Sequence, residues 1–479
     1  MIFHSLDFVA FFLVTCTLYW RLPHRWQNRL LLVASYVFYG WVTPWFTILL
    51  ATSTTIDWWA ARRMEADPVH RRRYLAFSVL SNMGMLAYFK YANFFCDNVA
   101  AALTALGFDT SPRVLSVVLP VGISFFTFQA LSYTIDVYRG QLRAGESFVD
   151  VATFVALFPQ LVAGPIERAA QLLPQVEGTR AFSVVAARTG LRLIAWGFFK
   201  KLVIADNVGV VADKVFALEQ PAFHVLWAGV LAFGLQIYAD FSAYSDIARG
   251  VARWFGFELM LNFDQPYFAR GIQDFWRRWH ISLSTWFRDY VYIPLGGSRH
   301  GRGREMANIM ATFLISGFWH GASWNFVLWG GFHGVLLLLS RLRRRVLPEP
   351  PRWARLLVPL QIAGTFVLVH IGWLMFRETE FAMLWRDLTL TPASATLVER
   401  QAGVVLLWRL LPYALPIVLA GLWVECFRGR VDPFEASVEW TGARGWASVV
   451  GDGLLVGALF AATLVFRSQA SLDFIYFAF

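Results

Sequence analysis

The chain has 479 residues, of which 57% are hydrophobic and only 15% are charged, and its mean hydropathy is +0.50. These values are typical of a polytopic membrane protein and exclude the soluble and disordered classes. The net charge of +10 comes from basic residues scattered between apolar stretches. This distribution indicates cytoplasmic loops and contact with membrane lipid, and it argues against nucleic acid as a partner.

Apolar segments of membrane-spanning character follow one another along the chain. They are residues 6–20, 30–39, 44–60, 74–95, 114–138, 148–162, 181–215, 223–255, 356–376, 406–426 and 447–466. With the central stretch 271–334 they predict about ten to twelve membrane segments. The first has no basic leader or A-x-A cleavage pattern, so we expect it to be retained. Since the sequence has no internal repeat or long linker, we predict one all-α domain, residues 1–479.

Several residues should interrupt these segments. Pro120 and Gly122 should bend or break the helix in 114–138. Lys200 and Lys201 lie among apolar residues and predict the end of a span near an interface. The three cysteines form no metal-type spacing, and a disulfide framework is not expected.

The central stretch begins with an amphipathic pattern. Between residues 272 and 290, apolar residues recur at steps of three, four and seven, which predicts one helix lying in the membrane interface. Its arginines, Arg277, Arg278 and Arg288, should face lipid headgroups. His280 falls at the border of the apolar stripe.

Two apolar arms, 305–319 and 324–340, follow a basic, glycine-rich loop and are bounded by arginines at both ends. Short basic loops favour the cytoplasmic side, so both ends of this pair should be cytoplasmic. The first arm would rise about 22 Å as a helix, less than a hydrocarbon core of about 30 Å. His320 should therefore lie within the bilayer, near the turn of a re-entrant or tilted pair. An ionisable group at that depth normally faces a protein-lined cavity.

His320 is the first candidate catalytic residue, because imidazole titrates near neutrality and can accept the proton of an attacking hydroxyl. The alternative is a Trp-His pair that anchors a helix end. His280 could orient a substrate or assist His320, or it could be scaffold. Metal binding is not expected, because His320 and His333 would point about 220° apart on one helix and no HExxH spacing occurs.

Other polar residues form the candidate substrate-binding set. Asp240, Tyr244 and Asp246 lie in an apolar segment, where carboxylates need partners. They could contact substrate, or the aspartates could pair with Arg249 or Arg277. Close to His320 are the remaining members of the set, Trp319, Ser323 and Asn325. Ser323 lacks the G-x-S-x-G elbow, which argues against a serine hydrolase.

Long motifs in a fixed order resemble one known family. They are PVGISFFTFQALSYTIDVYRG, FPQLVAGPIERA, QIYADFSAYSDIARG, NFDQPYFARGIQDFWRRWHISLSTWFRDYVYIPLGG and FWHGASWNFVLWGGFHG. The chain is similar to the membrane-bound O-acyltransferases, especially their bacterial alginate O-acetyltransferase branch, over a motif core of about residues 114–340.

The resemblance implies a polytopic helical bundle with re-entrant and interfacial helices around a central tunnel. His320 would match the family's catalytic histidine and His280 its supporting one. The donor would be a cytoplasmic acyl thioester such as acetyl-CoA, with no tightly bound cofactor. The acceptor would be a hydroxyl of an exported polysaccharide, reached directly or through a periplasmic SGNH-type partner. His320 would deprotonate that hydroxyl without a covalent enzyme intermediate, in a bacterial inner membrane.

Three alternatives remain open. Proteins that transfer D-alanine to teichoic acids share the histidine motifs, although the spans after residue 340 favour the polysaccharide branch. A glycan or lipid transporter without chemistry would also use broken helices and intramembrane aspartates. An inert scaffold of an export complex is the third. The histidine-bearing motifs favour the enzyme.

Overall fold

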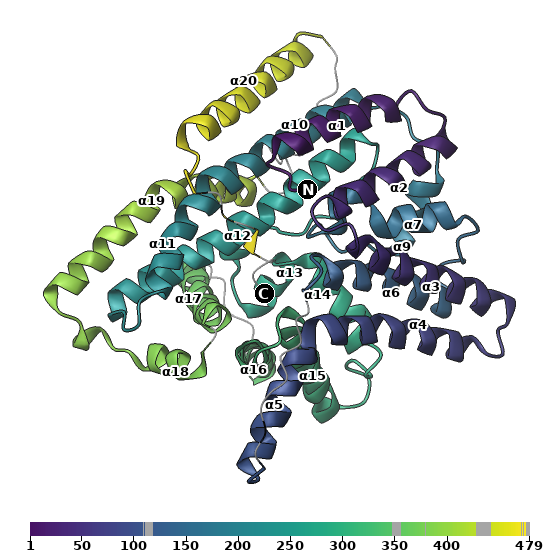
Figure 1. Ribbon diagram of the computed structural model, residues 1–479. Coiled ribbons are helices and arrows are strands. Elements are labelled where there is room, and N and C mark those ends of the chain that lie inside the picture. The colour runs from purple at the N-terminus through teal and green to yellow at the C-terminus, as the bar shows by residue number, and fades with distance from the viewer. Residues whose placement is uncertain are drawn as a thin grey trace. The chain divides into compact units, whose positions relative to one another are not determined.

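A computed structural model describes residues 1–108, 110, 118–346, 356–378, 380–427, 442–470, 472, 474 and 475, without the side chains of 345 and 442–448. The regular elements in these ranges are helices, and the ranges contain no strand (Figure 1). The all-α prediction is confirmed. Residues 114–117 of one predicted span lie outside the described residues.

The chain divides into two compact units. Unit 1 comprises Met1–Gly190 and Ala248–Met260, and unit 2 comprises Leu191–Ile247 and Leu261–Phe479. Each unit is described by itself below. The single domain expected for residues 1–479 stays a prediction.

Unit 1 is a bundle of helices with extensive polar cross-links. Its helices are α1 (Leu6–Tyr19), α2 (His24–Gly40), α3 (Phe46–Ala66), α4 (Arg71–Leu86), η1 (Ala87–Tyr91), α5 (Ala92–Ala105), α6 (Ile123–Arg139), α7 (Phe148–Ala156), α8 (Phe158–Leu161), α9 (Ala169–Glu177) and the start of α10 (Val184–Phe199). Helices α3, α4 and α6 pack side by side (Figure 1). The predicted interruption at Pro120 and Gly122 is confirmed, because α6 begins only at Ile123 and Gly122 adopts the left-handed conformation.

A buried carboxylate joins three of these helices. Asp57 of α3 is fully buried and accepts hydrogen bonds from Ser78 and Asn82 of α4. Ser78 also contacts the hydroxyl of Thr134 on α6. Each of these four polar side chains therefore has a partner, as the cost of burying polar groups requires.

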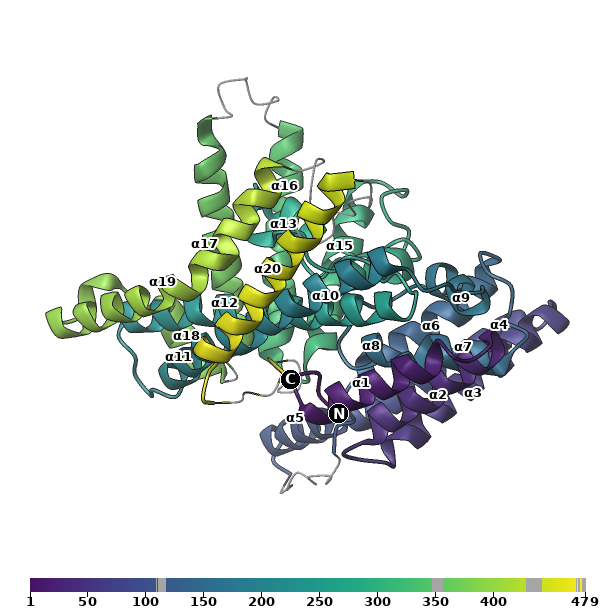
Figure 2. The same ribbon diagram turned by 90° about the horizontal axis from the view of Figure 1, so that it is seen from above.

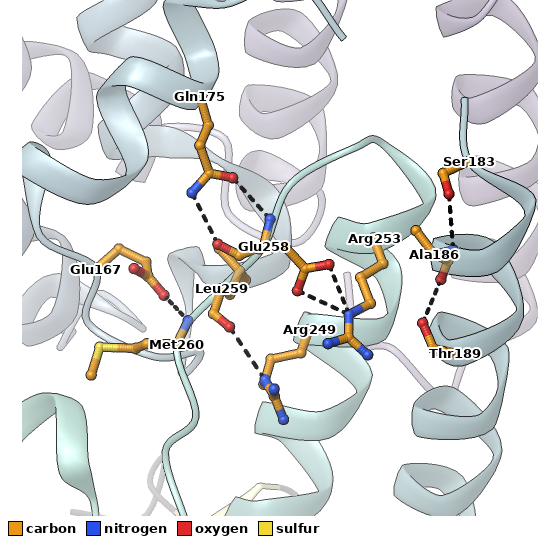
Figure 3. Close-up of polar contacts among 10 residues, drawn as sticks. All are labelled: Glu167, Gln175, Ser183, Ala186, Thr189, Arg249, Arg253, Glu258, Leu259 and Met260. Carbon is orange, nitrogen blue, oxygen red and sulfur yellow. Dashed lines mark hydrogen bonds and ion pairs between the residues drawn. The ribbon is translucent and has the colours of Figure 1, made fainter. Parts of the chain in front are cut away.

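The loop before α9 holds the segment Glu258–Met260 by its backbone (Figure 3). Glu167 accepts the Met260 N–H at 2.6 Å, and the Gln175 amide exchanges two hydrogen bonds with the backbone of Glu258. From the other side, Arg249 donates to the Leu259 carbonyl at 3.3 Å. These contacts fix the chain just before it passes from unit 1 to unit 2.

Glu167→Gln is expected to make the protein more stable than the wild type above pH 7. Burial raises the pKa of Glu167 to about 7, against about 4.3 for a free glutamate. Between these values the unfolded chain loses a proton that the folded chain keeps, so the unfolding free energy falls as pH rises, by about 3 kcal/mol in total. Glutamine still accepts the Met260 N–H but cannot ionise.

Thermal unfolding in detergent at pH 4 and pH 8 measures this effect. The difference between Glu167→Gln and the wild type should be small at pH 4 and large at pH 8. Glu258→Gln is the control, since its carboxylate forms an exposed pair with Arg253 and should change stability by less than about 1 kcal/mol. Equal stability of Glu167→Gln and wild type at pH 8 would contradict the prediction.

Unit 2 contains the longest apolar helices. Its elements are the end of α10, η2 (Lys200–Ala205), α11 (Asp206–Phe216), α12 (Phe223–Trp254, up to Ile247), η3 (Pro266–Phe268), α13 (Ile272–Arg278), α14 (Ile281–Phe287), η4 (Arg288–Tyr292), α15 (Arg302–His320), α16 (Trp324–Val346), α17 (Val358–Arg377), α18 (Phe381–Thr389), η6 (Pro392–Ser394), α19 (Leu397–Cys426) and α20 (Gly442–Phe466). Helices α16 and α17 lie side by side (Figure 2).

Five helices in the described ranges are long and apolar enough to cross a membrane. They are Phe223–Trp254, Trp324–Arg344, Val358–Arg377, Leu397–Cys426 and Val449–Phe466. The most apolar window of α12 is 78% buried and that of α19 only 17%, so α12 is a core helix and α19 presents apolar side chains outward, as lipid contact requires. The predicted span 148–162 is divided into two short helices at Leu157, and the span 181–215 is helical from Val184 with a π-helical segment, η2, inside it. The chain is a multi-pass membrane protein.

Candidate active site

The two predicted arms of the central stretch form a tight helical hairpin. Helix α15 ends at His320, and α16 begins at Trp324. Added Cβ atoms would lie 2.2 Å from the Phe326 carbonyl oxygen at Gly317 and 2.3 Å from the Phe313 carbonyl oxygen at Gly330. The two helices therefore approach backbone to backbone, as small residues allow in membranes. This close contact fixes the end of α15, where His320 lies.

Gly330→Ala is expected to destabilise the hairpin by at least about 1–3 kcal/mol, because its methyl group would overlap the α15 backbone and push the helices apart. Gly331→Ala is the matched control. At Gly331 the nearest atom is the Leu314 side chain at 3.6 Å, an ordinary contact, and alanine favours a helix. Thermal unfolding of both variants in detergent measures the difference, and equal stability would contradict the close helix contact.

His320 is buried in an aromatic enclosure. Its side chain is 6% exposed. The centroid of its ring lies 5.0 Å from that of Trp319, 5.0 Å from that of Trp329 and 5.3 Å from that of Phe376. The prediction that this histidine lies at the turn of the hairpin is confirmed. Apolar rings keep bulk water from the imidazole, which strengthens its electrostatic interactions.

His333 contacts the same tryptophan as His320, Trp329. The expected separation of about 220° assumed one continuous helix, but the chain turns at Gly321 between α15 and α16. Trp329 contacts both imidazoles, with its ring centroid 5.0 Å from that of His320 and 4.9 Å from that of His333. In the part of the chain that the structure describes, no three His, Cys, Asp or Glu side chains are grouped so that they could hold a metal ion.

His280 lies at a break, not in a helix. The predicted single interfacial helix over 272–290 is wrong, because α13 ends at Arg278 and α14 begins at Ile281. His280 has φ +43° and ψ +55°, the left-handed conformation, and its Nδ1 accepts the Leu283 N–H at 3.2 Å. Its side chain is 1% exposed, not at the border of a stripe, and burial lowers its pKa to about 3. The ring is therefore neutral.

Asn262 stabilises the turn between α13 and α14. This residue was not among those predicted from the sequence. It is fully buried. Its backbone carbonyl accepts the Ile281 N–H at 2.9 Å, and its Oδ1 accepts both the N–H and the hydroxyl of Ser282. Its amide donates to Ser245 on α12. Eighteen residues of sequence separate it from His280 without any periodicity, so no local signal could have connected them.

Arg278 does not face headgroups as predicted. It is buried, and its guanidinium pairs with Asp274 at 3.0 Å and with Glu425 of α19. Arg277 and Arg288 are exposed, as expected, and Arg288 pairs with the adjacent Asp289 at 2.7 Å. The break after α13 rotates Arg278 inward, where a buried cation needs carboxylate partners.

The two aspartates of the apolar segment on α12 pair with lysines of η2. Lys200 contacts Asp246 at 2.6 Å, and Lys201 contacts Asp240 at 3.0 Å and Asp206 at 2.9 Å. Both lysines are buried on η2, and the expectation that they end a span near an interface stays a prediction. The wider turn of a π-helix places two consecutive lysines toward α12.

The same cluster contacts Leu472, Phe474 and Ile475. Lys201 donates to the Leu472 carbonyl at 2.9 Å, and Asp240 accepts the Ile475 N–H at 2.7 Å. The ring of Phe474 lies 5.1 Å from that of Tyr244. These contacts are structural, and substrate binding by Asp240, Tyr244 and Asp246 stays a prediction.

The polar residues after His320 also have structural contacts. Asn325 is buried and donates from its side chain to the Glu378 carbonyl. Ser323 accepts the Asn325 N–H at 3.4 Å. Together they close the turn of the hairpin, and their role toward substrate stays a prediction.

Aromatic side chains connect the two candidate histidines within unit 2. Trp279, next to His280, lies 4.7 Å from Trp373 between ring centroids. Trp373 lies 5.8 Å from Phe376, which lies 5.3 Å from His320. A chain of ring contacts thus links the residue beside His280 to His320. In such an arrangement one imidazole can act as a base while the other forms a hydrogen bond to the substrate.

Comparison with known proteins agrees with this architecture. Residues 141–378, which include both histidines, match the family described as MBOAT, membrane-bound O-acyltransferase family. The chain is 42% identical over 391 residues to "Probable alginate O-acetylase AlgI" of Azotobacter vinelandii (81% of this chain, 77% of the relative). The protein of the same name from Pseudomonas aeruginosa is 43% identical (81% and 74%). "Peptidoglycan O-acetyltransferase" of Helicobacter pylori is 34% identical over 386 residues (74% and 71%).

These similarities confirm the resemblance noted from the sequence motifs, and they agree with the multi-pass helical architecture. The chain belongs to the membrane-bound O-acyltransferase family and is an O-acyltransferase.

Proposed function

We propose that this protein transfers an acetyl group from a cytoplasmic acyl thioester, acetyl-CoA, to hydroxyl groups of an exported polysaccharide. The names of its relatives specify alginate and peptidoglycan as their acceptors, both of which are exported glycans. Because these relatives are bacterial proteins, we place this protein in the bacterial inner membrane. Acetyl-CoA serves as a substrate in this proposal, and no tightly bound cofactor takes part.

The observation that carries the proposal is the position of His320. It ends α15 at a backbone-to-backbone helical hairpin, and its ring is enclosed by Trp319, Trp329 and Phe376. Burial keeps the imidazole neutral, the form that can accept a hydroxyl proton, and its enclosure fixes the position of the ring.

In the proposed reaction, His320 accepts the proton of the acceptor hydroxyl as the hydroxyl oxygen forms a bond to the thioester carbonyl carbon. The resulting tetrahedral intermediate carries a negative oxygen. When it collapses, the carbon–sulfur bond breaks, and the leaving thiolate takes the proton from His320. An oxygen ester and a free thiol result, and no covalent intermediate forms on the protein.

The acceptor hydroxyl belongs either to the polysaccharide itself or to a periplasmic partner of SGNH-hydrolase type that passes the acetyl group on. Both routes have the same chemistry at His320. They differ in whether the purified chain alone acetylates polysaccharide.

The test uses a strain lacking this protein and proteoliposomes that contain it. The strain should export polysaccharide without O-acetyl groups, and the plasmid-borne chain should restore them. Proteoliposomes supplied with labelled acetyl-CoA on one side should release free CoA when an acceptor is present on the other. Unchanged O-acetylation in the deletion strain would overturn the proposal, and polymer that stays inside the cell would indicate a transporter instead.

A further inference from the structure

The antiparallel register of α15 and α16 brings the outer ends of these two helices together. Beyond the contact of Gly330 with the α15 backbone, an added Cβ atom at Gly334 would lie 3.0 Å from the sulfur of Met310. Still farther from the turn, Arg341 of α16 forms an ion pair with Glu305 of α15. The first turn of α15 therefore lies beside the last turns of α16.

Exposed arginines gather at these joined ends. The side chains that the structure describes there include five of them: Arg299, Arg302, Arg304, Arg343 and Arg344. Between positions 296 and 346 the only acidic residue is Glu305, and Arg341 already neutralises it. No ion pair within the described ranges involves any of the five. Neighbouring like charges repel one another, and an anion bound among them removes that repulsion.

The loop that carries the first of these arginines is folded onto α15. The side-chain amide of Asn308 donates to the Gly297 carbonyl at 2.9 Å, and the Arg299 N–H donates to the Gly296 carbonyl at 3.1 Å. Asn308 is buried, so the loop is fixed to the helix from inside. The backbone that presents the arginine cluster is thus ordered before any ligand binds, which lowers the entropy cost of binding.

An apolar stripe of α16 leads up to the cluster and indicates which anion it receives. Val335, Leu339 and Leu342 recur at helical spacing and are 46%, 56% and 57% exposed. Helix α16 is one of the helices long and apolar enough to cross a membrane, so this stripe faces acyl chains. Arginine binds phosphate oxygens with two parallel N–H groups. A phospholipid combines both features, because its phosphate group is attached to acyl chains.

We propose that the five arginines at the joined ends of α15 and α16 form a binding site for an anionic phospholipid. Its phosphodiester lies among Arg302, Arg343 and Arg344, and its acyl chains run along the exposed stripe of α16. Since the bound headgroup contacts arginines of both helices, it stabilises the hairpin whose turn carries His320. The proposal does not depend on which group the protein transfers.

The experiment measures thermal unfolding of the purified chain in an uncharged detergent, with phosphatidylglycerol or with phosphatidylcholine of the same acyl chains. Phosphatidylglycerol should raise the unfolding midpoint and phosphatidylcholine should not, because a ligand of the folded state stabilises it. The double variant Arg302→Gln with Arg344→Gln should need at least about tenfold more phosphatidylglycerol for the same rise, since each arginine near anionic lipid contributes about fivefold in affinity. Without lipid it should unfold at the wild-type temperature, because both side chains are exposed.

Arg409→Gln with Arg467→Gln is the control that removes the same charge elsewhere. These two arginines are also exposed, but one lies on α19 and the other follows α20. The control should respond to phosphatidylglycerol like the wild type. An equal loss of response in both double variants would overturn the proposal, because net charge and not the cluster would then attract the lipid.

Two further outcomes would also overturn it. Equal stabilisation of the wild type by both lipids would mean that the arginines do not recognise the anionic headgroup. The other concerns free CoA, added in phosphatidylcholine as a second source of phosphate. If CoA raises the unfolding midpoint of the wild type but not that of the Arg302 and Arg344 variant, the cluster binds a soluble phosphate compound and not a lipid.

Discussion

His320→Gln is expected to lower the rate of acetyl transfer by about 10²–10⁴-fold, the contribution of a positioned general base. Glutamine is similar in size to histidine and can hydrogen-bond, but it cannot take a proton from a hydroxyl. The aromatic enclosure by Trp319, Trp329 and Phe376 leaves little water to act in its place. The loss should appear in single-turnover release of CoA from labelled acetyl-CoA in proteoliposomes, with unchanged thermal unfolding.

His333→Gln provides the matched control for this variant. His333 is also buried and contacts the same ring, with its centroid 4.9 Å from that of Trp329. Any general loss of packing around Trp329 should affect both variants alike. If the rate of acetyl transfer by His320→Gln is within about tenfold of the rate by His333→Gln, His320 is not the base.

The features predicted correctly from the sequence are those that local periodicity determines. The helical arms before and after His320 can be predicted from the sequence because their apolar residues and the arginines that bound them lie within one segment. The break before α6 is visible because Pro120 and Gly122 act on their own neighbours. The family motifs place both histidines within residues 141–378.

The predictions that were wrong concern residues whose contacts lie far away in the sequence. Periodicity favours one helix over 272–290, but contacts from Asn262 stabilise the left-handed turn at His280 that divides it. Arg278 has helical spacing suited to the surface, yet its partner Glu425 lies 147 positions later. Tertiary contacts can override local propensity, and one sequence does not reveal which ones do.

The same limit explains the lysines. An apolar stretch interrupted by Lys200 and Lys201 is typical of a span that reaches an interface. Only the π-turn of η2 and the facing carboxylates of α11 and α12 make burial of these lysines possible. The aspartates were rightly expected to need cationic partners, but the partners are lysines of a preceding helix.

Lys201→Met should destabilise the protein by at least about 3–5 kcal/mol, the cost of removing one partner from a buried ion pair. Lys201 is 6% exposed and contacts two carboxylates, Asp206 and Asp240, each 2% exposed. Without its ammonium group both would remain buried and uncompensated. The midpoint of thermal or denaturant unfolding in detergent measures the loss, and Lys214→Met, an exposed lysine of α11, is the control.

Neutralising a carboxylate separates charge from packing in this cluster. If uncompensated charge causes the loss, Lys201→Met combined with Asp240→Asn should recover much of the stability, because only Asp206 then remains charged. Lys201 also donates to the Leu472 carbonyl, so Lys201→Met should increase proteolytic cleavage after residue 467 as well. A double variant no more stable than Lys201→Met alone would mean that the lysine acts through packing and the chain end, and not through its charge.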